Sequence, residues 1–146
     1  MIVYIDMDDV LCNFTETANQ DLKLNPAIQF PQSQYGFYTK LRPLSGAINA
    51  VNALLDSDKY TPYILTAPSV KNPLCYTEKR IWVEQHLGFE MVNRLIISPN
   101  KSLLKGQYLI DDNHTGRCQS EFEGELLHFG TSLYPDWASI RKYLDV

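Results

Sequence analysis

Five short apolar segments recur along the chain, and each of them ends at polar residues, at glycine or at a Ser-Pro pair. The segments are rich in β-branched and aromatic side chains, which is typical of buried parallel strands. The first segment stops abruptly at a group of acidic residues. The pattern predicts strands over Met1–Ile5, Pro62–Leu65, Arg94–Ile97, Tyr108–Ile110 and Leu126–Phe129.

Between these segments, apolar residues recur with the helical period of about 3.6 residues. This period predicts helices over Leu44–Leu55, Tyr76–Leu87 and Pro135–Leu144. We expect the second helix to stop at Gly88, because glycine commonly caps the C-terminus of a helix, and the third to carry its proline in the first turn. Strands that alternate with helices predict an α/β fold, a Rossmann-like three-layer sandwich with a central parallel sheet.

The segment from Asn13 to Pro43 breaks this alternation. It contains a candidate helix over Phe14–Leu24, followed by a stretch rich in proline, glutamine, serine and aromatic residues. A connection this long inside a compact domain is usually functional. Because it follows the first strand directly, we expect a short helical and loop cap over the strand ends. The chain of 146 residues is therefore predicted to form a single domain, 1–146, with a cap insert at about 13–43.

Composition narrows the classes of partner. A formal net charge of -4 argues against a groove for duplex nucleic acid. No stretch approaches the roughly 18 apolar residues that a membrane helix needs, and the N-terminus lacks the basic lead of a secretory signal. The 3 cysteines are widely spaced and fit no disulfide framework, which favours a reducing, cytoplasmic location. A small anionic ligand held by a metal ion remains compatible with this composition.

Polar residues with complementary chemistry follow the predicted strands. Since the carboxyl ends of parallel strands meet at one edge of the sheet, these residues are expected to converge there. Several carboxylates crowded together require a cation, and oxygen ligands favour Mg²⁺. A hydroxyl and a lysine beside that ion would complete a site for a phosphoryl group. The residues concerned are Asp6, Asp8 and Asp9, then Thr66, then Lys101, and finally Asp111, Asp112 and Asn113.

Taken singly, each of these features has an ordinary structural explanation. Acids after a strand often cap the next helix, and the pair at Asp111 and Asp112 fits a turn. Thr66 alone fits a hydroxyl at a strand end, and Lys101 alone fits a solvated surface charge. The functional interpretation depends on their joint arrangement at one edge.

The order of these motifs resembles the haloacid dehalogenase-like phosphatase superfamily, and within it the 5'(3')-deoxyribonucleotidase family. The resemblance covers nearly the whole chain and is weakest over 15–36 and after Thr115. The WVEQHLG segment and the ten-residue step from Lys101 to Asp111 are typical of that family. The motifs that carry the resemblance are IDMDDVLCNF (5–14), ILTAPS (64–69), CYTEKRIWVEQHLGF (75–89) and NKSLLKGQYLIDDN (100–113).

The resemblance implies the catalytic roles. Asp6 would be the nucleophile that forms an aspartyl-phosphate. Asp8 would protonate the leaving group and then deprotonate water. Mg²⁺ would be held by the Asp6 side chain, the Asp8 backbone carbonyl and one acid of the later pair. We favour Asp112 as that ligand, with Asp111 orienting water or Lys101, although the residues alone leave the choice open.

The resemblance also implies how substrate is held. Thr66 and Lys101 would bind the non-bridging phosphate oxygens. Relatives carry serine at the position of Ala67, so contacts there come from the backbone alone. Relatives usually have glycine where this chain has Asp9 and aspartate where it has Asn13. Phe14 and Phe37 are candidates for stacking on the base, whereas Tyr35 and Tyr38 are expected to cover a small core of the cap.

The implied function is a Mg²⁺-dependent phosphomonoesterase for deoxyribonucleoside 5'- or 3'-monophosphates. One alternative is a phosphatase of the same mechanism for a sugar phosphate or a nucleic-acid end. Another is a catalytically silent nucleotide-binding module, against which the intact Asp6 and Asp8 argue. A phosphoacceptor signalling domain is disfavoured because the third predicted strand ends in Ser98-Pro99 instead of an acid. Related enzymes are often dimers, so a homodimer is among the expected partners.

Overall fold

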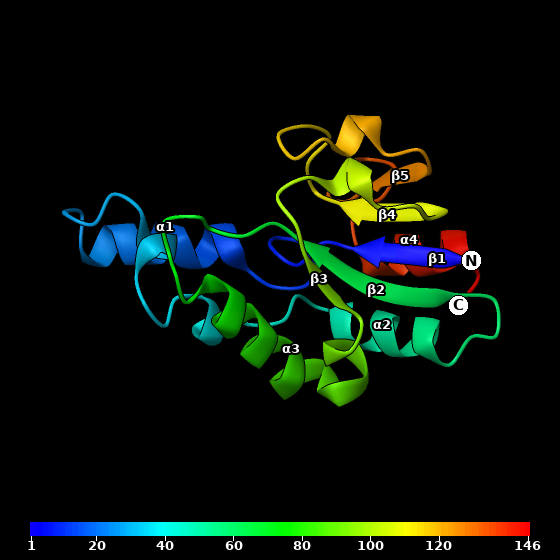
Figure 1. The fold of residues 1–146 in the computed structure, drawn as a ribbon, viewed down its shortest axis with the longest axis horizontal. Helices are drawn as coiled ribbons and strands as arrows, with labels where there is room; N and C mark the ends of the chain where they lie inside the picture. The colour runs from blue at the N-terminus through cyan, green and yellow to red at the C-terminus, as the bar shows by residue number, and fades with distance from the viewer.

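The computed structural model describes residues 1–146 and contains a five-stranded, all-parallel sheet in the order β3-β2-β1-β4-β5 (Figure 1). The predicted strands are confirmed to within one residue at each end. The strands are β1 (Ile2–Ile5), β2 (Thr61–Thr66), β3 (Leu95–Ile97), β4 (Tyr108–Asp111) and β5 (Glu125–His128). The helices are α1 (Phe14–Leu24), α2 (Ala47–Leu55), α3 (Cys75–Val92) and α4 (Trp137–Leu144).

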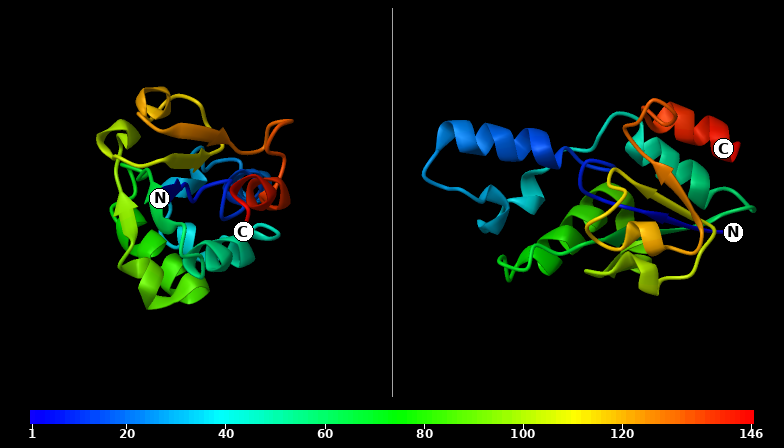
Figure 2. Two further views of the ribbon diagram at one scale, coloured as in Figure 1. Left: turned by 90° about the vertical axis from the view of Figure 1, so that its right-hand side faces the viewer. Right: turned by 90° about the horizontal axis from the view of Figure 1, so that it is seen from above.

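The two faces of the sheet are covered differently (Figure 2). Helices α2, α3 and α4 pack against the face that carries Val3 and Ile5. The opposite face carries Tyr4 and Leu109, and it is covered by residues such as Phe122 at the end of a short 3₁₀ turn. The connections from β3 to β4 and from β4 to β5 hold only such turns. The expected third layer is therefore present, but it is built of turns and loops.

Two predicted helices start later than expected. Helix α2 begins at Ala47 and not at Leu44, because the Leu44 amide donates to the carbonyl of Leu11 at 2.9 Å. Helix α4 begins at Trp137, after a capping box formed by Asp136 and Ser139. The proline at position 135 thus precedes the first turn and does not lie within it.

Helix α3 is longer than predicted. Gly88 does leave helical geometry, with φ of 76° and ψ of -179°, in the left-handed region that glycine tolerates. One further helical turn follows it and ends at Val92. Gly88 therefore marks a break within the helix and not its end. None of the helices is both long enough and apolar enough to cross a bilayer.

Residues 13–43 project beyond the carboxyl end of β1, with α1 pointing away from the sheet (Figure 1). The two ends of this cap are joined by hydrogen bonds from the Asn13 amide to the Arg42 carbonyl at 3.0 Å and from the Arg42 amide to Asn13 Oδ1 at 2.8 Å. Helix α3 holds the returning half, because Trp82 Nε1 donates to the Leu41 carbonyl at 2.8 Å. The cap is thus fixed at its base and along one side.

Candidate active site

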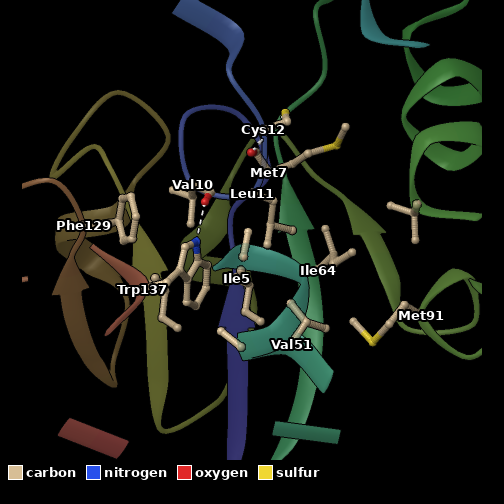
Figure 3. Close-up of a cluster of buried hydrophobic side chains, with 14 of the residues drawn as sticks. Ile5, Met7, Val10, Leu11, Cys12, Val51, Ile64, Met91, Phe129 and Trp137 are labelled. Atoms are coloured by element: carbon tan, nitrogen blue, oxygen red, sulfur yellow. Dashed lines mark hydrogen bonds between the residues drawn. The ribbon is translucent and has the colours of Figure 1, made fainter. Parts of the chain in front are cut away.

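The loop after β1 is a rigid base for the acidic residues. Its apolar side chains Met7, Val10, Leu11 and Cys12 are all fully buried. The Leu11 and Cys12 amides both donate to the Met7 carbonyl, at 2.8 and 3.0 Å. Trp137 Nε1 of α4 donates to the Val10 carbonyl at 2.8 Å, as Figure 3 shows. A loop packed in this way holds the acids on either side of Met7 in one arrangement.

The sheet register brings three carboxylates together. Ile5 pairs with Ile110, so Asp6, directly after β1, lies beside Asp111, the last residue of β4. The Asp6 amide donates to the Ile110 carbonyl at 2.8 Å and extends this pairing. One carboxylate oxygen from each of Asp6, Asp111 and Asp112 lies within 4.8 Å of the others. Residues more than a hundred positions apart thus form one acidic cluster at the carboxyl edge.

Lys101 enters this cluster from a 3₁₀ turn over Lys101–Leu103 and is almost completely buried. Its Nζ lies 2.7 Å from Asp6 Oδ1 and forms a close ion pair with Asp111 Oδ2. Burial opposes the charged form, but the two carboxylates outweigh it and raise the pKa of Lys101 above its ordinary value. Lys101 therefore stays protonated beside the candidate nucleophile.

The two adjacent acids at the end of β4, Asp111 and Asp112, have different partners. Both oxygens of Asp111 are engaged, one by Lys101 and the other by the Asn113 amide at 2.9 Å and Gln119 Nε2 at 3.3 Å. Asp112 Oδ1 is buried and has no hydrogen-bond partner. Both oxygens of Asp111 are therefore satisfied within the protein, whereas Asp112 has a buried oxygen without a partner.

The oxygen donors fit a hard divalent ion. Buried oxygens without a hydrogen bond occur on Asp6, Asp8 and Asp112, each at Oδ1. Asp6 Oδ1 faces Lys101 closely, but not with the geometry of a hydrogen bond. Unsatisfied buried oxygens are costly, and a cation coordinated by carboxylates removes that cost. Mg²⁺ and Ca²⁺ prefer such oxygen ligands.

Asp8 is held by a buried lysine that the sequence did not single out. Lys79 of α3 is fully buried, and its Nζ donates to Asp8 Oδ2 at 2.8 Å. Burial raises the pKa of Asp8; Lys79 opposes this effect and the nearby Asp6 adds to it. A carboxyl with a raised pKa can carry the proton that a leaving group needs.

Lys79 also hydrogen-bonds to the hydroxyl of Thr66. Lys79 Nζ donates to Thr66 Oγ1 at 2.6 Å and to the Ala67 carbonyl at 2.9 Å. Thr66 is fully buried and does not line the cavity above the acids, whereas Ala67 does. The structure thus places Ala67 nearer to the open space and Thr66 behind it.

A cavity of about 310 Å³ opens above these residues and is enclosed on one side by the cap. Its lining joins the carboxyl ends of three strands to the first turn of α1. A volume of this size fits a small ligand. The residues singled out from the sequence that line it are Asp6, Asp8, Asp9, Phe14, Ala67, Lys101, Asp112 and Asn113.

The aromatic residues of the cap divide into two groups. Phe14 lines the cavity, and its ring meets Phe37 edge-on with 5.4 Å between the centroids. Phe37 is only 1% exposed and Tyr38 only 2%. Phe37 therefore supports Phe14 from behind and offers no free face for stacking. The expectation that Tyr35 covers a cap core is wrong, since 69% of it is exposed.

Sequence reasoning also missed Glu78, which holds the cap from α3. Its carboxylate is buried and accepts hydrogen bonds from the Gly36 amide at 2.6 Å and the Tyr38 amide at 3.0 Å. A signal was present, because Glu78 and Lys79 occupy the helix face that also carries Cys75 and Trp82. Charged residues on an apolar helix face indicate buried partners.

A pH dependence follows from Asp112. Burial, with the charges of Asp6 and Asp111, raises the pKa of Asp112 to about 7, against an ordinary value of about 4 in the unfolded chain. The resulting contribution to stability is complete below the unfolded pKa and is lost as pH rises through about 7. Without metal, the contribution of Asp112 should therefore lower the free energy of unfolding between about pH 4 and about pH 7. Asp112→Asn should reduce this fall in urea denaturation with a chelator present.

The exposed Asp58→Asn variant is the matched control and should keep the wild-type pH dependence. If the free energy of unfolding of Asp112→Asn depends on pH as it does in the wild type, burial and the neighbouring carboxylates do not raise the pKa of Asp112.

Comparison with known proteins places this site in a family context. A family described as "5' nucleotidase, deoxy (Pyrimidine), cytosolic type C protein" matches residues 24–133. A putative 5'(3')-deoxyribonucleotidase of Vibrio phage KVP40 is 40% identical over 98% of this chain and 84% of its own length. The human 5'(3')-deoxyribonucleotidase of cytosolic type is 42% identical over 59% of this chain. The chain spans 43% of the human protein, and 34% of the mouse mitochondrial enzyme, which is 32% identical over the matched part.

Proposed function

The chain belongs to the 5'(3')-deoxyribonucleotidase family, within the haloacid dehalogenase-like superfamily, and we propose that it hydrolyses deoxyribonucleoside monophosphates at their 5'- or 3'-phosphate. The observation that carries this proposal is the cluster of Asp6, Asp111 and Asp112 beside the buried Lys101. A catalytically silent binding module has no need of a buried carboxylate that faces both a cation site and a lysine. The human relative is of cytosolic type, which supports a cytoplasmic location for this chain as well.

In the first chemical step, a carboxylate oxygen of Asp6 attacks phosphorus and the bond from phosphorus to the ester oxygen breaks. Asp8 gives its proton to the departing alkoxide, which leaves as an alcohol. The raised pKa of Asp8 supports this role, because burial shifts this carboxyl toward the form that can donate a proton. The product of the step is an aspartyl-phosphate on Asp6.

In the second step, the ionised Asp8 takes a proton from water, and the water oxygen attacks the aspartyl-phosphate. The bond between phosphorus and the Asp6 oxygen breaks, so that inorganic phosphate leaves and both aspartates regain their starting states. Lys79 supports this exchange because it holds Asp8 by one oxygen only, at 2.8 Å from Oδ2. The other oxygen, Oδ1, has no hydrogen-bond partner and is free to carry the proton.

Mg²⁺ is the ion that we assign to the acidic cluster, and the Asp6 side chain, the Asp8 backbone carbonyl and Asp112 would hold it. When bound, it neutralises the repulsion between the phosphate and the carboxylate that attacks it. The unpartnered Oδ1 of Asp112 supports its role as a ligand, and the engaged oxygens of Asp111 support a positioning role for that residue. Removal of divalent ions with a chelator should abolish turnover, and Mg²⁺ should restore it, as measured by phosphate release.

Substrate is held by two parts of the site. Lys101 supplies a full positive charge to the phosphate oxygens, and the backbone at Ala67 lines the same cavity. Thr66 acts through Lys79, since its hydroxyl accepts from that residue. Phe14 is the ring that can stack on a base, and the buried Phe37 is not retained for that role.

A substrate panel tests the nucleotide assignment. We expect dUMP and dTMP to give values of kcat/KM at least about tenfold above those of glucose 6-phosphate, because base stacking on an aromatic ring contributes about 1–3 kcal/mol. Phe14→Ala should remove most of this preference and leave the hydrolysis of glucose 6-phosphate nearly unchanged. Faster turnover of sugar phosphates than of dUMP or dTMP would contradict the assignment.

A further inference from the structure

A second groove continues from the catalytic cavity. It has a volume of about 300 Å³ and shares Phe14, Pro68 and Arg117 with the cavity above the acids. It runs between the cap on one side and the segment after β2 on the other, with Phe30 and Lys71 at its outer part. A molecule that leaves the catalytic cavity past Phe14 therefore enters this groove directly.

The charged residues that line the two spaces differ. The catalytic cavity is lined by four aspartates, Asp6, Asp8, Asp9 and Asp112, and by two cations, Lys101 and the shared Arg117, so its lining carries a net negative charge. The groove has no acidic residue in its lining and carries two cations, Lys71 and Arg117. Neither cation lies within 4.0 Å of a carboxylate oxygen. On a chain with a net charge of -4, this local positive charge favours an anionic ligand.

Arg117 is fixed to the catalytic residues through its backbone. Its carbonyl accepts a hydrogen bond from the Lys101 amide at 2.9 Å, and its amide donates to Gln119 Oε1 at 2.8 Å. The same Gln119 donates through Nε2 to Asp111 Oδ1 at 3.3 Å. The guanidinium thus extends from a backbone whose position is set by Lys101 and Asp111.

The two walls of the groove are also joined. Asn72 is almost completely buried, and its Nδ2 donates to the carbonyls of Gln32 and Gln34 in the cap at 3.2 and 3.3 Å. Across the groove, Lys71 Nζ lies 5.1 Å from the centre of the Phe30 ring. The cap and the segment after β2 therefore form a groove whose width is set before any ligand arrives.

We propose that this groove binds a second phosphate group, on the far side of the deoxyribose from the one hydrolysed, so that a deoxynucleoside 3',5'-bisphosphate is the better substrate. The inference rests on the proposed function, because it places the reacting phosphate beside Asp6. A base and a sugar are neutral and give no reason for two unpaired cations. Water and one phosphate ester become an alcohol and inorganic phosphate, while the second ester stays intact against Lys71 and Arg117.

The experiment compares thymidine 3',5'-bisphosphate with dTMP in the wild type, with Mg²⁺ present. We expect a KM about tenfold lower for the bisphosphate, because charge-assisted hydrogen bonds are the strong ones. The 5'-phosphorylated dinucleotide pTpT is the third substrate and shows whether a bridging phosphate occupies the groove as well as a terminal one does. A KM for the bisphosphate below that for dTMP supports the inference, whether or not the KM for pTpT is lower as well. A lower KM for pTpT alone, or for neither, overturns it.

Variants localise the effect. The ratio of the KM for dTMP to the KM for the bisphosphate measures the effect. Arg117→Met and Lys71→Met should each reduce this ratio, and the double variant should bring it to within about twofold of one. Lys142→Met removes an exposed charge from α4 and should keep the wild-type ratio. If Arg117→Met fails to fold, the exposed Lys71→Met still decides the matter. If dTMP itself is not hydrolysed, the proposed function fails; if dTMP is hydrolysed and the ratio is one, only the present inference fails.

Discussion

Replacement of Asp6 by Asn should reduce phosphate release from dTMP by roughly 10⁴-fold or more, a loss of the size found when a nucleophile is removed. The amide has nearly the same shape, so the fold and the cavity should persist, but it cannot attack phosphorus as a carboxylate does. Binding of dTMP in the presence of Mg²⁺, measured by calorimetry, should remain detectable. The prediction concerns the chemical step and not the affinity for substrate.

The control for this experiment is Asp58→Asn, which makes the same chemical change at an exposed position. It should retain wild-type turnover. Activity of Asp6→Asn within about tenfold of the wild type would show that another group attacks phosphorus. Equal and negligible turnover in the wild type and in Asp6→Asn would favour a nucleotide-binding module.

Replacement of Lys79 by Met should destabilise the fold by about 3 kcal/mol, because loss of one partner of a buried ion pair leaves the other charge without compensation. Lys79 is fully buried and forms three polar contacts, with Asp8, Thr66 and Ala67. Its Nζ also lies 4.9 Å from the centre of the Tyr38 ring. The free energy of unfolding from urea denaturation at pH 7.5 is the measurement that tests this.

A double-mutant cycle shows whether the pair acts as a unit. Asp8→Asn combined with Lys79→Met removes both charges, so the double variant should be more stable than Lys79→Met alone. Additive losses for the two substitutions would mean that Lys79 contributes through packing and not through Asp8. The double variant should remain inactive in either case, since it lacks the carboxyl of Asp8.

The sheet could be predicted from the sequence because each strand contains a short apolar run that is bounded by polar residues, by glycine or by a Ser-Pro pair. Buried parallel strands require this pattern on both faces. The convergence of Asp6, Lys101 and Asp111 followed from the strand ends, and the structure brings these three together. Helix boundaries were less accurate, because Leu44 is held by the loop at Leu11 and Gly88 only interrupts its helix.

The hydrogen-bond partners of the buried side chains could not be predicted from the sequence in the same way. Lys79 reaches Asp8 across 71 positions, and Glu78 reaches Gly36 across 42. Such contacts depend on how α3 packs against the cap, which the local pattern does not determine. Phe37 is a further example. Its position in the sequence suggested a ring over the substrate, but the ring is buried inside the cap.

The most direct test is a crystal structure of the wild-type protein with Mg²⁺ and vanadate, a mimic of the phosphoryl group in transfer. We expect one ion in contact with the Asp6 carboxylate, the Asp8 carbonyl and the Asp112 carboxylate, with vanadium facing Asp6 and its oxygens near Lys101. An ion bound outside this cluster, or vanadate bound away from Asp6, would contradict this expectation.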